Sequence, residues 1–245
     1  MSLYVGATSG DYGTRSSSLI DHNAAYTWMA WVDLAADLNT YGYIWSSNAW
    51  SNSDNVRVDA DGATVAYCCV RASSESATYG ANALVVDTPM HLALVRESAT
   101  TLRLYQNGVN LNSIGTNVAA RAASSGEWLG RLDADYCRCR LTAIKCWQAA
   151  LSAEEIAAEM RAIRPLRLAN LHSWHPAIAG NVTDALKDYS GNGRDWTANG
   201  SPSVAAQTPA VSWGNCPLLI LPVTVITQKL APVSDVAAGS WLPSS

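Results

Sequence analysis

The residues with the clearest chemical potential lie in one short polar run, DYSGNG at 188–193. Glycine adopts positive φ at little cost, and the side chains of Asp, Ser and Asn hydrogen-bond to nearby backbone groups. Such a run folds into a tight loop that points oxygen atoms inward. Asp188 and Asn192 offer the hard oxygens that calcium prefers, so they form a candidate calcium site. The alternative is a surface turn whose oxygens accept hydrogen bonds from the loop's own amides.

No arrangement of residues typical of an enzyme accompanies this loop. Glycosidases need two carboxyl groups roughly 5–10 Å apart, one as acid and one as nucleophile or base. Glu75, Glu97 and Glu127 are isolated along the sequence, and Asp133 and Asp135 lie in a turn-like stretch. The sequence also lacks G-x-S-x-G, H-E-x-x-H and a glycine-rich phosphate loop. We therefore expect a protein that is not an enzyme and that needs no cofactor, calcium apart.

The six cysteines do not follow the spacing of common zinc sites. Cys137 and Cys139 form a C-x-C pair, which on a strand would point both sulfur atoms to one face. There they would either hold a soft metal or pack as small buried side chains. The N-terminus, MSLYVGATSGDYG, has neither the basic nor the apolar region of a secretory signal. Because disulfides form mainly in secreted proteins, we expect the cysteines to be free thiols.

Composition and charge limit the classes of partner. Of the 245 residues, 15% are charged and 49% are hydrophobic, and the formal net charge is −4. No basic field is available to gather phosphates, which argues against nucleic acid as a partner. The most apolar run, Leu218–Ile226, contains Pro222 and is far shorter than the roughly 20 residues of a membrane helix. We therefore expect no membrane insertion.

Short strands account for most of the remaining pattern. Tyr26–Leu34 alternates, with Tyr26, Trp28, Ala30, Val32 and Leu34 on one face. Asn107-Gly108 is the dipeptide that favours a type I′ hairpin, and it separates two further apolar runs. Many short strands joined by Gly and Asn turns indicate a β-sandwich or a barrel.

One short helix is expected after Leu151. Ser152 and Glu155 have the spacing of a capping box, and Pro165 should end the helix. Ile156, Met160 and Ile163 would form its apolar stripe. We expect the nearby glutamates to serve as caps and as a solvated face rather than as an active site; they are Glu154, Glu155 and Glu159.

Several of these segments, taken together, resemble laminin-G-like domains of the concanavalin A-like fold. They are YTWMAWV at 26–32, HLALVRESATTLRLYQNG at 91–108, GEWLGR at 126–131, LTAIKCWQAALSAEEI at 141–156 and DYSGNG at 188–193. The resemblance implies an all-β jelly-roll sandwich with one short helix. Some members of this family bind calcium, which supports the candidate site at Asp188 and Asn192.

The order of the segments differs from that of common single-domain members, in which D-x-S-G-N-G precedes the Ala-Trp-Val strand. Because the first and last strands of a sandwich can be neighbours, a permuted order costs little. We therefore divide the chain into a sandwich at 1–213, of which 168–213 carries the displaced segment, and an extended C-terminal arm at 214–245. The alternative is that residues 168–213 begin a second small domain.

The arm is rich in proline and β-branched residues and cannot form a core of its own. It either packs along its own sandwich or extends to a neighbouring subunit, as an assembly arm. In the second case the contacts would come from its apolar side chains, which are Leu218, Ile220, Val223, Val225 and Trp241.

This layout, and the ending SDVAAGSWLPSS at 234–245, resemble laminin-G-like domains in structural proteins of tailed bacteriophages. The resemblance implies a non-catalytic virion protein made in the host cytoplasm, either a head decoration or cement protein or a tail or fibre subunit. Its partners would be further copies of itself in a homo-oligomer and other virion proteins, with cell-surface glycans as additional ligands.

Sugars stack their apolar faces on exposed aromatic rings, so Trp45, Trp50 and Tyr79 are candidate glycan-binding residues. The alternative function is a soluble, lectin-like carbohydrate-binding module of a bacterial surface or secreted protein.

Overall fold

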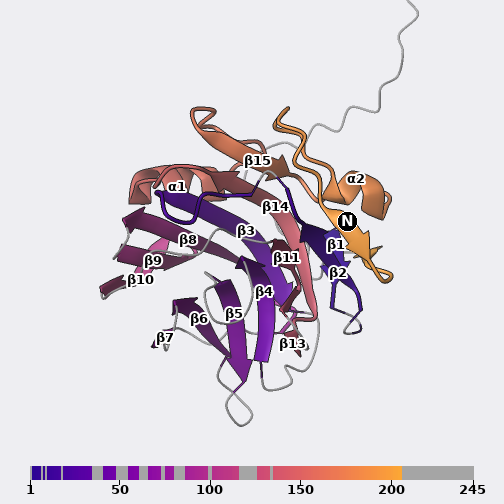
Figure 1. The fold of residues 1–245 in the computed structure, drawn as a ribbon, viewed down its shortest axis with the longest axis horizontal. Helices are drawn as coiled ribbons and strands as arrows, with labels where there is room; N and C mark the ends of the chain where they lie inside the picture. Colours follow the sequence, from indigo (N-terminus) through magenta and orange to yellow (C-terminus); the bar gives the residue numbers. More distant parts are fainter. Residues whose placement is uncertain are drawn as a thin grey trace, which may run out of the picture.

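Two antiparallel β-sheets face each other in the computed structural model of the chain (Figure 1). The structure describes residues 2–6, 8, 10–17, 19–34, 41–47, 55–60, 66–72, 75–79, 86–98, 101–115, 126–132 and 135–205. This architecture is the predicted jelly-roll sandwich. None of the helices in these ranges is long and apolar enough to cross a membrane.

The first sheet has eight strands in the order β10-β9-β8-β3-β14-β1-β17, and its eighth strand, β15, also pairs with β14. The strands are β1 (Ser2–Val5), β3 (Tyr26–Leu34), β8 (Met90–Ser98), β9 (Thr101–Gln106), β10 (Val109–Gly115), β14 (Cys139–Trp147), β15 (Leu171–His175) and β17 (Ser203–Ala205).

The second sheet has seven strands in the order β16-β2-β11-β4-β5-β6-β7. They are β2 (Tyr12–Arg15), β4 (Tyr41–Ser47), β5 (Asn55–Ala60), β6 (Ala66–Ala72), β7 (Glu75–Tyr79), β11 (Glu127–Leu129) and β16 (Thr197–Asn199). A small ribbon and two helices complete the described part; they are β12 (Arg131–Leu132), β13 (Asp135–Tyr136), α1 (Ala153–Met160) and α2 (Val182–Leu186).

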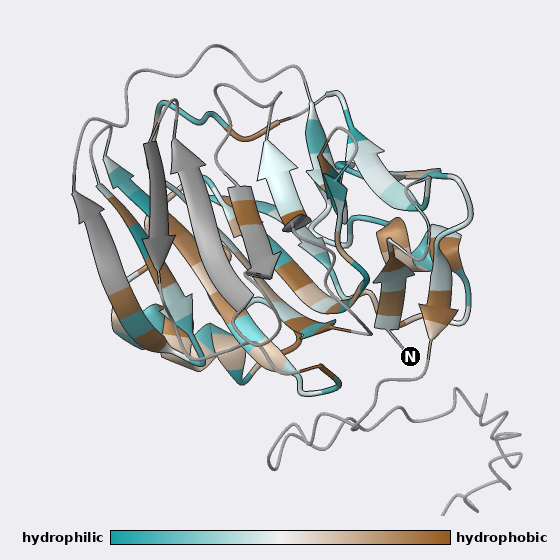
Figure 2. Cartoon of the chain, turned by 90° about the horizontal axis from the view of Figure 1, so that it is seen from below, coloured by the Kyte–Doolittle hydropathy of each residue, from teal (hydrophilic) through white to brown (hydrophobic). Residues whose placement is uncertain are grey.

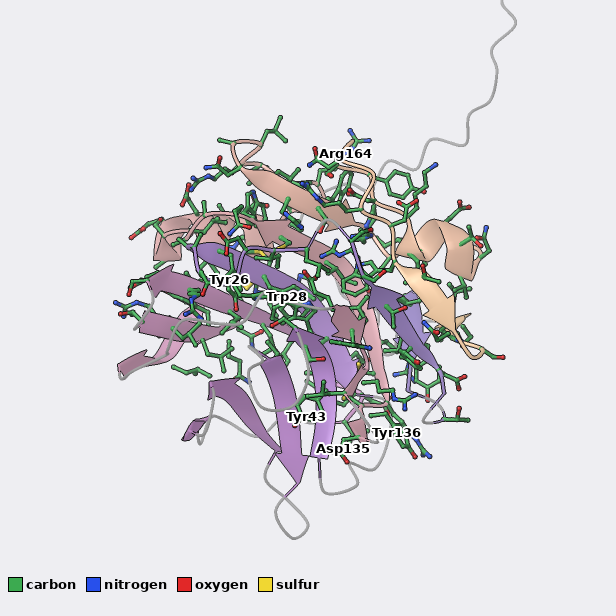
Figure 3. All side chains as sticks on the ribbon, viewed as in Figure 1. Tyr26, Trp28, Tyr43, Asp135, Tyr136 and Arg164 are labelled. Atoms are coloured by element: carbon green, nitrogen blue, oxygen red, sulfur yellow. The ribbon has the colours of Figure 1, made fainter. Side chains whose placement is uncertain are left out.

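The alternation along β3 separates two apolar clusters. As predicted, alternate residues from Tyr26 to Leu34 lie in the core between the sheets, and Tyr26 and Trp28 are labelled there in Figure 3. Met29 points to the other face, where Trp147 and Ile156 join it in a smaller cluster under α1. Figure 2 shows hydrophobic residues along the strands and hydrophilic residues in many of the connecting loops.

Local turn and capping signals are confirmed. Asn107 and Gly108 have φ values of 51° and 79°, as a type I′ hairpin between β9 and β10 requires. At the start of α1 the backbone N–H of Glu155 donates to the Ser152 hydroxyl at 3.2 Å, and the N–H of Ser152 donates to the Glu155 carboxylate at 2.8 Å. The helix ends at Met160, before Pro165, so proline is not what ends it and Ile163 lies beyond it.

The expectation that Glu159 is solvated is wrong. Its side chain is 1% exposed and accepts a hydrogen bond from the Lys145 ammonium at 2.7 Å. Lys145 also donates to the carbonyls of Glu159 and Ala162, at 2.9 and 2.6 Å. The lysine on β14 therefore holds the C-terminal end of α1 against the outer face of the first sheet.

Residues 171–205 contribute strands to both sheets of the sandwich. β15 pairs with β14, β16 with β2 and β17 with β1, and Ser2 lies opposite Ala205. Figure 1 shows the N-terminus, next to β1, beside the orange ribbon of the last described segment. The boundary at residue 213 and the arm residues, Leu218 to Trp241, lie outside the described residues and stay predictions.

Candidate functional site

The loop DYSGNG at 188–193 has the tight backbone that its glycines predict. Gly191 and Gly193 have φ values of 89° and 67°, a region that favours glycine. No heavy atom lies within 4 Å of the position that a Cβ would take at either glycine, so the backbone conformation, rather than space, requires glycine there.

The carboxylate of Asp188 organises this loop through four hydrogen bonds. One oxygen accepts from the backbone N–H groups of Trp174 and Ser190, at 3.0 and 2.9 Å. The other accepts from the Ser190 hydroxyl at 2.8 Å and from the N–H of Arg194 at 2.9 Å. Burial of Asp188 disfavours its charged form, but these hydrogen bonds outweigh burial and hold the pKa of the carboxyl below its usual value.

The same contacts correct the calcium hypothesis. A carboxylate has about four lone-pair sites, and protein donors occupy all four at Asp188. The side-chain amide of Asn192 donates to the carbonyls of Leu171 and His172, at 3.0 and 3.1 Å. The hydrogen-bonded turn therefore describes Asp188 and Asn192. Among the described residues, no three His, Cys, Asp or Glu side chains come together as metal ligands.

The loop covers the free edge of β15, which pairs with β14 on its other side. Asp188 accepts from the N–H of Trp174, while the N–H of Tyr189 donates to the Trp174 carbonyl at 2.8 Å. Further along the strand, the His172 carbonyl accepts from Asn192 and from the Arg194 guanidinium. Unpaired strand edges are templates for pairing with other chains, so the loop protects this one.

One aromatic residue of the loop points away from these contacts. The side chain of Tyr189 is exposed, and its ring centroid lies 6.1 Å from that of Trp174, at an interplanar angle of 60°. The Lys187 ammonium lies 5.7 Å from the Tyr189 ring centroid. The exposed ring of Tyr189 and the ammonium of Lys187 therefore lie next to each other. The backbone that carries them is held in place by the hydrogen bonds of Asp188.

The candidate glycan-binding residues are not brought together as expected. Trp45 is fully buried and stacks on Trp28, with ring centroids 5.5 Å apart, so its proposed contact with sugar is wrong. The pairing of β4 with β5 shifts register between Tyr43 and Trp45, and both Ile44 and Trp45 lie in the core cluster between the sheets. Trp50 and the side chain of Tyr79 lie outside the described part of the chain, and their roles stay predictions.

Five carboxylates are buried among the side chains whose burial the structure describes, and each of them is bound to protein donors. Glu127 pairs with Arg15 and accepts from the N–H of Ile20. The others are Asp11 with Thr8 and Ser201, Asp33 with Arg140, Glu159 with Lys145, and Asp188 with its four donors. A hydrogen bond from the Ser201 N–H lowers the pKa of Asp11 despite burial, which is opposite to what a general acid needs.

The C-x-C pair packs inside the sandwich. Cys137, Cys139 and Cys146 are buried and free. The hydrogen bond with Cys137, followed by burial, raises the pKa of the Cys139 thiol well above its usual value. Because metals bind the thiolate, a protonated buried thiol fits the role of a small apolar side chain better than that of a soft-metal ligand.

Comparison with known proteins identifies the fold family. The family model of the concanavalin A-like lectin/glucanases superfamily matches residues 7–157, more than half of the chain. A search of curated proteins found no match.

Several solved structures share the fold at low identity. A putative carbohydrate-binding protein from Bacteroides ovatus has a TM-score of 0.58 at 13% identity, over 79% of this chain and 61% of its own. The heptameric SAP-like pentraxin of Limulus polyphemus has a TM-score of 0.57 at 12% identity, over 85% of this chain and 95% of its own. Tailspike protein 2 from the Escherichia coli O157:H7 bacteriophage CAB120 has a TM-score of 0.55 at 12% identity, over 72% of this chain and 28% of its own. The match thus covers about three fifths of the Bacteroides protein and under a third of the tailspike.

Proposed function

This chain belongs to the concanavalin A-like lectin/glucanases superfamily, and from that membership we propose that it is a non-catalytic module that binds carbohydrate. The superfamily name covers sugar-binding proteins and sugar-cleaving enzymes. The contacts of the described carboxylates support the first of these two classes.

The observation that carries the proposal concerns the carboxylates whose burial the structure describes. Each of the buried ones among them accepts hydrogen bonds from protein donors. A glycosidase needs one protonated carboxyl group and a second that is free to attack the sugar or to activate water. The lowered pKa values of Asp11 and Asp188 favour their charged forms instead. Binding without cleavage is the function that this arrangement supports.

A glycan array probed with the full chain tests the proposal, together with an assay for reducing ends released from every glycan that binds. We expect binding to at least one glycan class and no release of reducing ends. Release by the purified chain would show that a catalytic pair exists, and a blank array would contradict carbohydrate binding.

A second proposal concerns the setting in which the module works. We propose that it is a structural subunit of a phage particle, assembled through protein–protein contacts as a homo-oligomer. Its support is the likeness of the fold to a phage tailspike and the sequence resemblance of residues 234–245 to phage structural proteins. Head decoration and a place in the tail or fibre both fit. A soluble lectin-like module of a bacterial surface or secreted protein is the alternative.

Light scattering after size exclusion, on the full chain and on a chain stopped after Asn215, tests this setting. If residues 216–245 form an assembly arm, the full chain should be an oligomer and the shortened chain a folded monomer. Two monomers of equal stability would contradict the arm and favour the soluble module.

A further inference from the structure

We propose that Tyr189 and Lys187, supported by Trp174, form a binding site for an anionic pyranoside, a sugar ring that carries a carboxylate or a sulfate. The inference rests on the proposed carbohydrate-binding function and gives it a place and a ligand class. It replaces the buried Trp45 as the candidate contact with sugar.

The first argument is exposure. Among the side chains whose exposure the structure describes, five large hydrophobic ones are exposed, and Tyr189 is the aromatic one of these five, at 45% of its surface. The other four are Val86, Val109, Leu166 and Leu168. An aromatic ring stacks on the apolar face of a pyranose, whereas an aliphatic side chain offers no such flat surface.

The second argument is preorganisation. Tyr189 follows Asp188 directly, and its own N–H donates to the Trp174 carbonyl at 2.8 Å. The backbone on both sides of the tyrosine is therefore tied to β15 by the hydrogen bonds of Asp188 and Asn192. The Trp174 ring, at 6.1 Å, limits the orientations of the tyrosine ring from one side. Little conformational entropy remains to be lost when a ligand binds.

The third argument is charge. The exposed Lys187 lies over the Tyr189 ring and forms no ion pair with the residues that the structure describes. The carboxylates nearest in sequence have other partners. Asp188, which directly follows Lys187, accepts four hydrogen bonds from protein donors. Asp184 accepts from the Asn181 amide, and Asp195 accepts from the N–H of Asp188. An anionic group on a stacked sugar would thus meet an unpaired ammonium beside the ring.

Sugar is a better match than a protein surface. A protein interface of standard size buries about 800 Å² per partner around a broad apolar core. Here one exposed ring is flanked by the polar groups of Ser190, Asn192 and Lys187. Ring stacking with neighbouring hydrogen-bonding groups is the pattern that a single sugar unit requires.

The test uses the full chain and three oligosaccharides of equal length: a galacturonic acid oligomer, a sulfated galactan oligomer and a neutral galactan oligomer. Binding is measured by isothermal titration calorimetry for wild type, Tyr189→Ala, Tyr189→Phe, Lys187→Gln and the control Val109→Ala. Val109 is an exposed apolar side chain on β10, at the other end of the first sheet from β1 and β17. Thermal unfolding of each variant checks that the fold is intact.

We expect wild type to bind one or both anionic oligomers more tightly than the neutral one. Comparison of the galacturonic acid oligomer with the sulfated one identifies whether the anionic group is a carboxylate or a sulfate. Tyr189→Ala should weaken binding roughly tenfold or more, because a stacked ring is lost. Tyr189→Phe, which keeps the ring, should lose less. Lys187→Gln should remove the preference for the anionic oligomers, and Val109→Ala should bind like wild type.

Four outcomes would overturn the proposal in distinguishable ways. If wild type binds glycans and Tyr189→Ala binds them equally, the site is wrong and the carbohydrate-binding function stands. Preference for the neutral oligomer overturns the ligand class. If wild type binds no glycan on the full array, the proposed function fails together with the site. Loss of self-association in Tyr189→Ala, with glycan binding unchanged, would identify a protein contact instead.

Discussion

Lys145 and Glu159 place two opposite charges in the layer between β14 and α1, each with a side chain 1% exposed. Replacing Lys145 by Ala would leave the Glu159 carboxylate buried without its cation. We expect the free energy of unfolding to fall by about 3–5 kcal/mol, the usual cost of breaking a buried ion pair from one side. Urea denaturation of the variant and of wild type measures the loss.

The matched control is Arg103→Ala, which breaks the exposed ion pair between Arg103 and Glu97. Exposed pairs contribute roughly 0–1 kcal/mol, so this variant should unfold at nearly the wild-type urea concentration. Similar losses in both variants would show that the position of Lys145 under α1 does not matter.

A second residue-scale prediction concerns acid stability. Burial, together with the charge of Arg15, lowers the pKa of His175 to about 4, from an ordinary value near 6.5. Burial, together with the charge of Lys145, lowers the pKa of His91 to about 3. Between pH 6.5 and 4 the unfolded chain binds protons that these folded imidazoles do not bind. Stability should therefore fall as the pH is lowered, by up to about 1.4 kcal/mol per pH unit for each histidine.

Denaturation of wild type and of His175→Gln at pH 7, 6, 5 and 4.5 tests this expectation. The variant should show a smaller decline over this range, because one of the two titrating groups is removed. Asp11 and Asp188 also have lowered pKa values. The stability that their charged forms contribute is lost only when the pH falls below the ordinary pKa of a carboxyl group, so they do not account for the decline above pH 4.5. Parallel curves for wild type and variant would contradict a depressed pKa at His175.

At the scale of elements, the DYSGNG loop acts as a cover for the edge of β15. Asp188→Ala would leave the N–H groups of Trp174 and Arg194 without their acceptor. Each unsatisfied buried donor costs about 1–3 kcal/mol, so we expect a loss of roughly 2–5 kcal/mol in the free energy of unfolding. Without the loop over its edge, β15 of one molecule should also pair with a strand of another molecule. Size exclusion should therefore show aggregates that wild type does not form.

The control for the loop is Ser190→Ala, which removes the hydroxyl donor to Asp188 and leaves the backbone N–H donors and their carboxylate acceptor in place. We expect it to lose about 1 kcal/mol and to run on size exclusion as wild type does. If Ser190→Ala aggregated as much as Asp188→Ala does, exposure of the β15 edge would not explain the aggregation of the Asp188 variant.

The elements that follow from the sequence are those with a local cause. The alternation of Tyr26–Leu34, the Asn107-Gly108 turn and the Ser152 cap each act over a few residues, and all three are present in the structure. The short elements β1 and α2, of four and five residues, carry too little pattern to be predicted.

Contacts between distant segments explain what the sequence could not show. The sequence could not favour the hydrogen-bonded turn over the calcium site, because a donor to Asp188 comes from Trp174 on another element. The residue type of Trp45 does not predict whether its ring faces sugar or the core. The pairing of β4 with its neighbours determines which of the two it faces. The role of Glu159 depends in the same way on Lys145, which lies on β14.

At the scale of the whole molecule, the last strands of the described chain complete sheets that the first strands begin. β17 runs antiparallel to β1, with Leu3 opposite Val204, and β16 pairs with β2. The Asp11 carboxylate accepts from the N–H of Ser201 at 2.7 Å, which ties the two ends together. The unusual order of the family segments is therefore a change in connectivity within one sandwich.

This arrangement predicts that the chain can be cut and rejoined to give the order of common family members. A variant would begin at Ala169, run to Ala205, continue through a short Gly-rich turn into Ser2 and end at Leu168. Because Ser2 lies opposite Ala205, a hairpin turn of two to five residues can join them. The cut falls beside Leu168, which is 72% exposed, and insertions and cuts are tolerated best at such exposed positions.

We expect this variant to fold cooperatively, with a melting temperature within about 10 °C of a chain that ends at Ala205 in the native order. Circular dichroism measures the melt, and the fluorescence of the buried Trp28 and Trp45 reports the core. A matched control with the same turn but a cut within β3 should fail to fold, because β3 pairs with both β8 and β14. If the first variant also failed, the link between α1 and β15 would be essential, and the closeness of the two ends would not suffice to explain the permuted order.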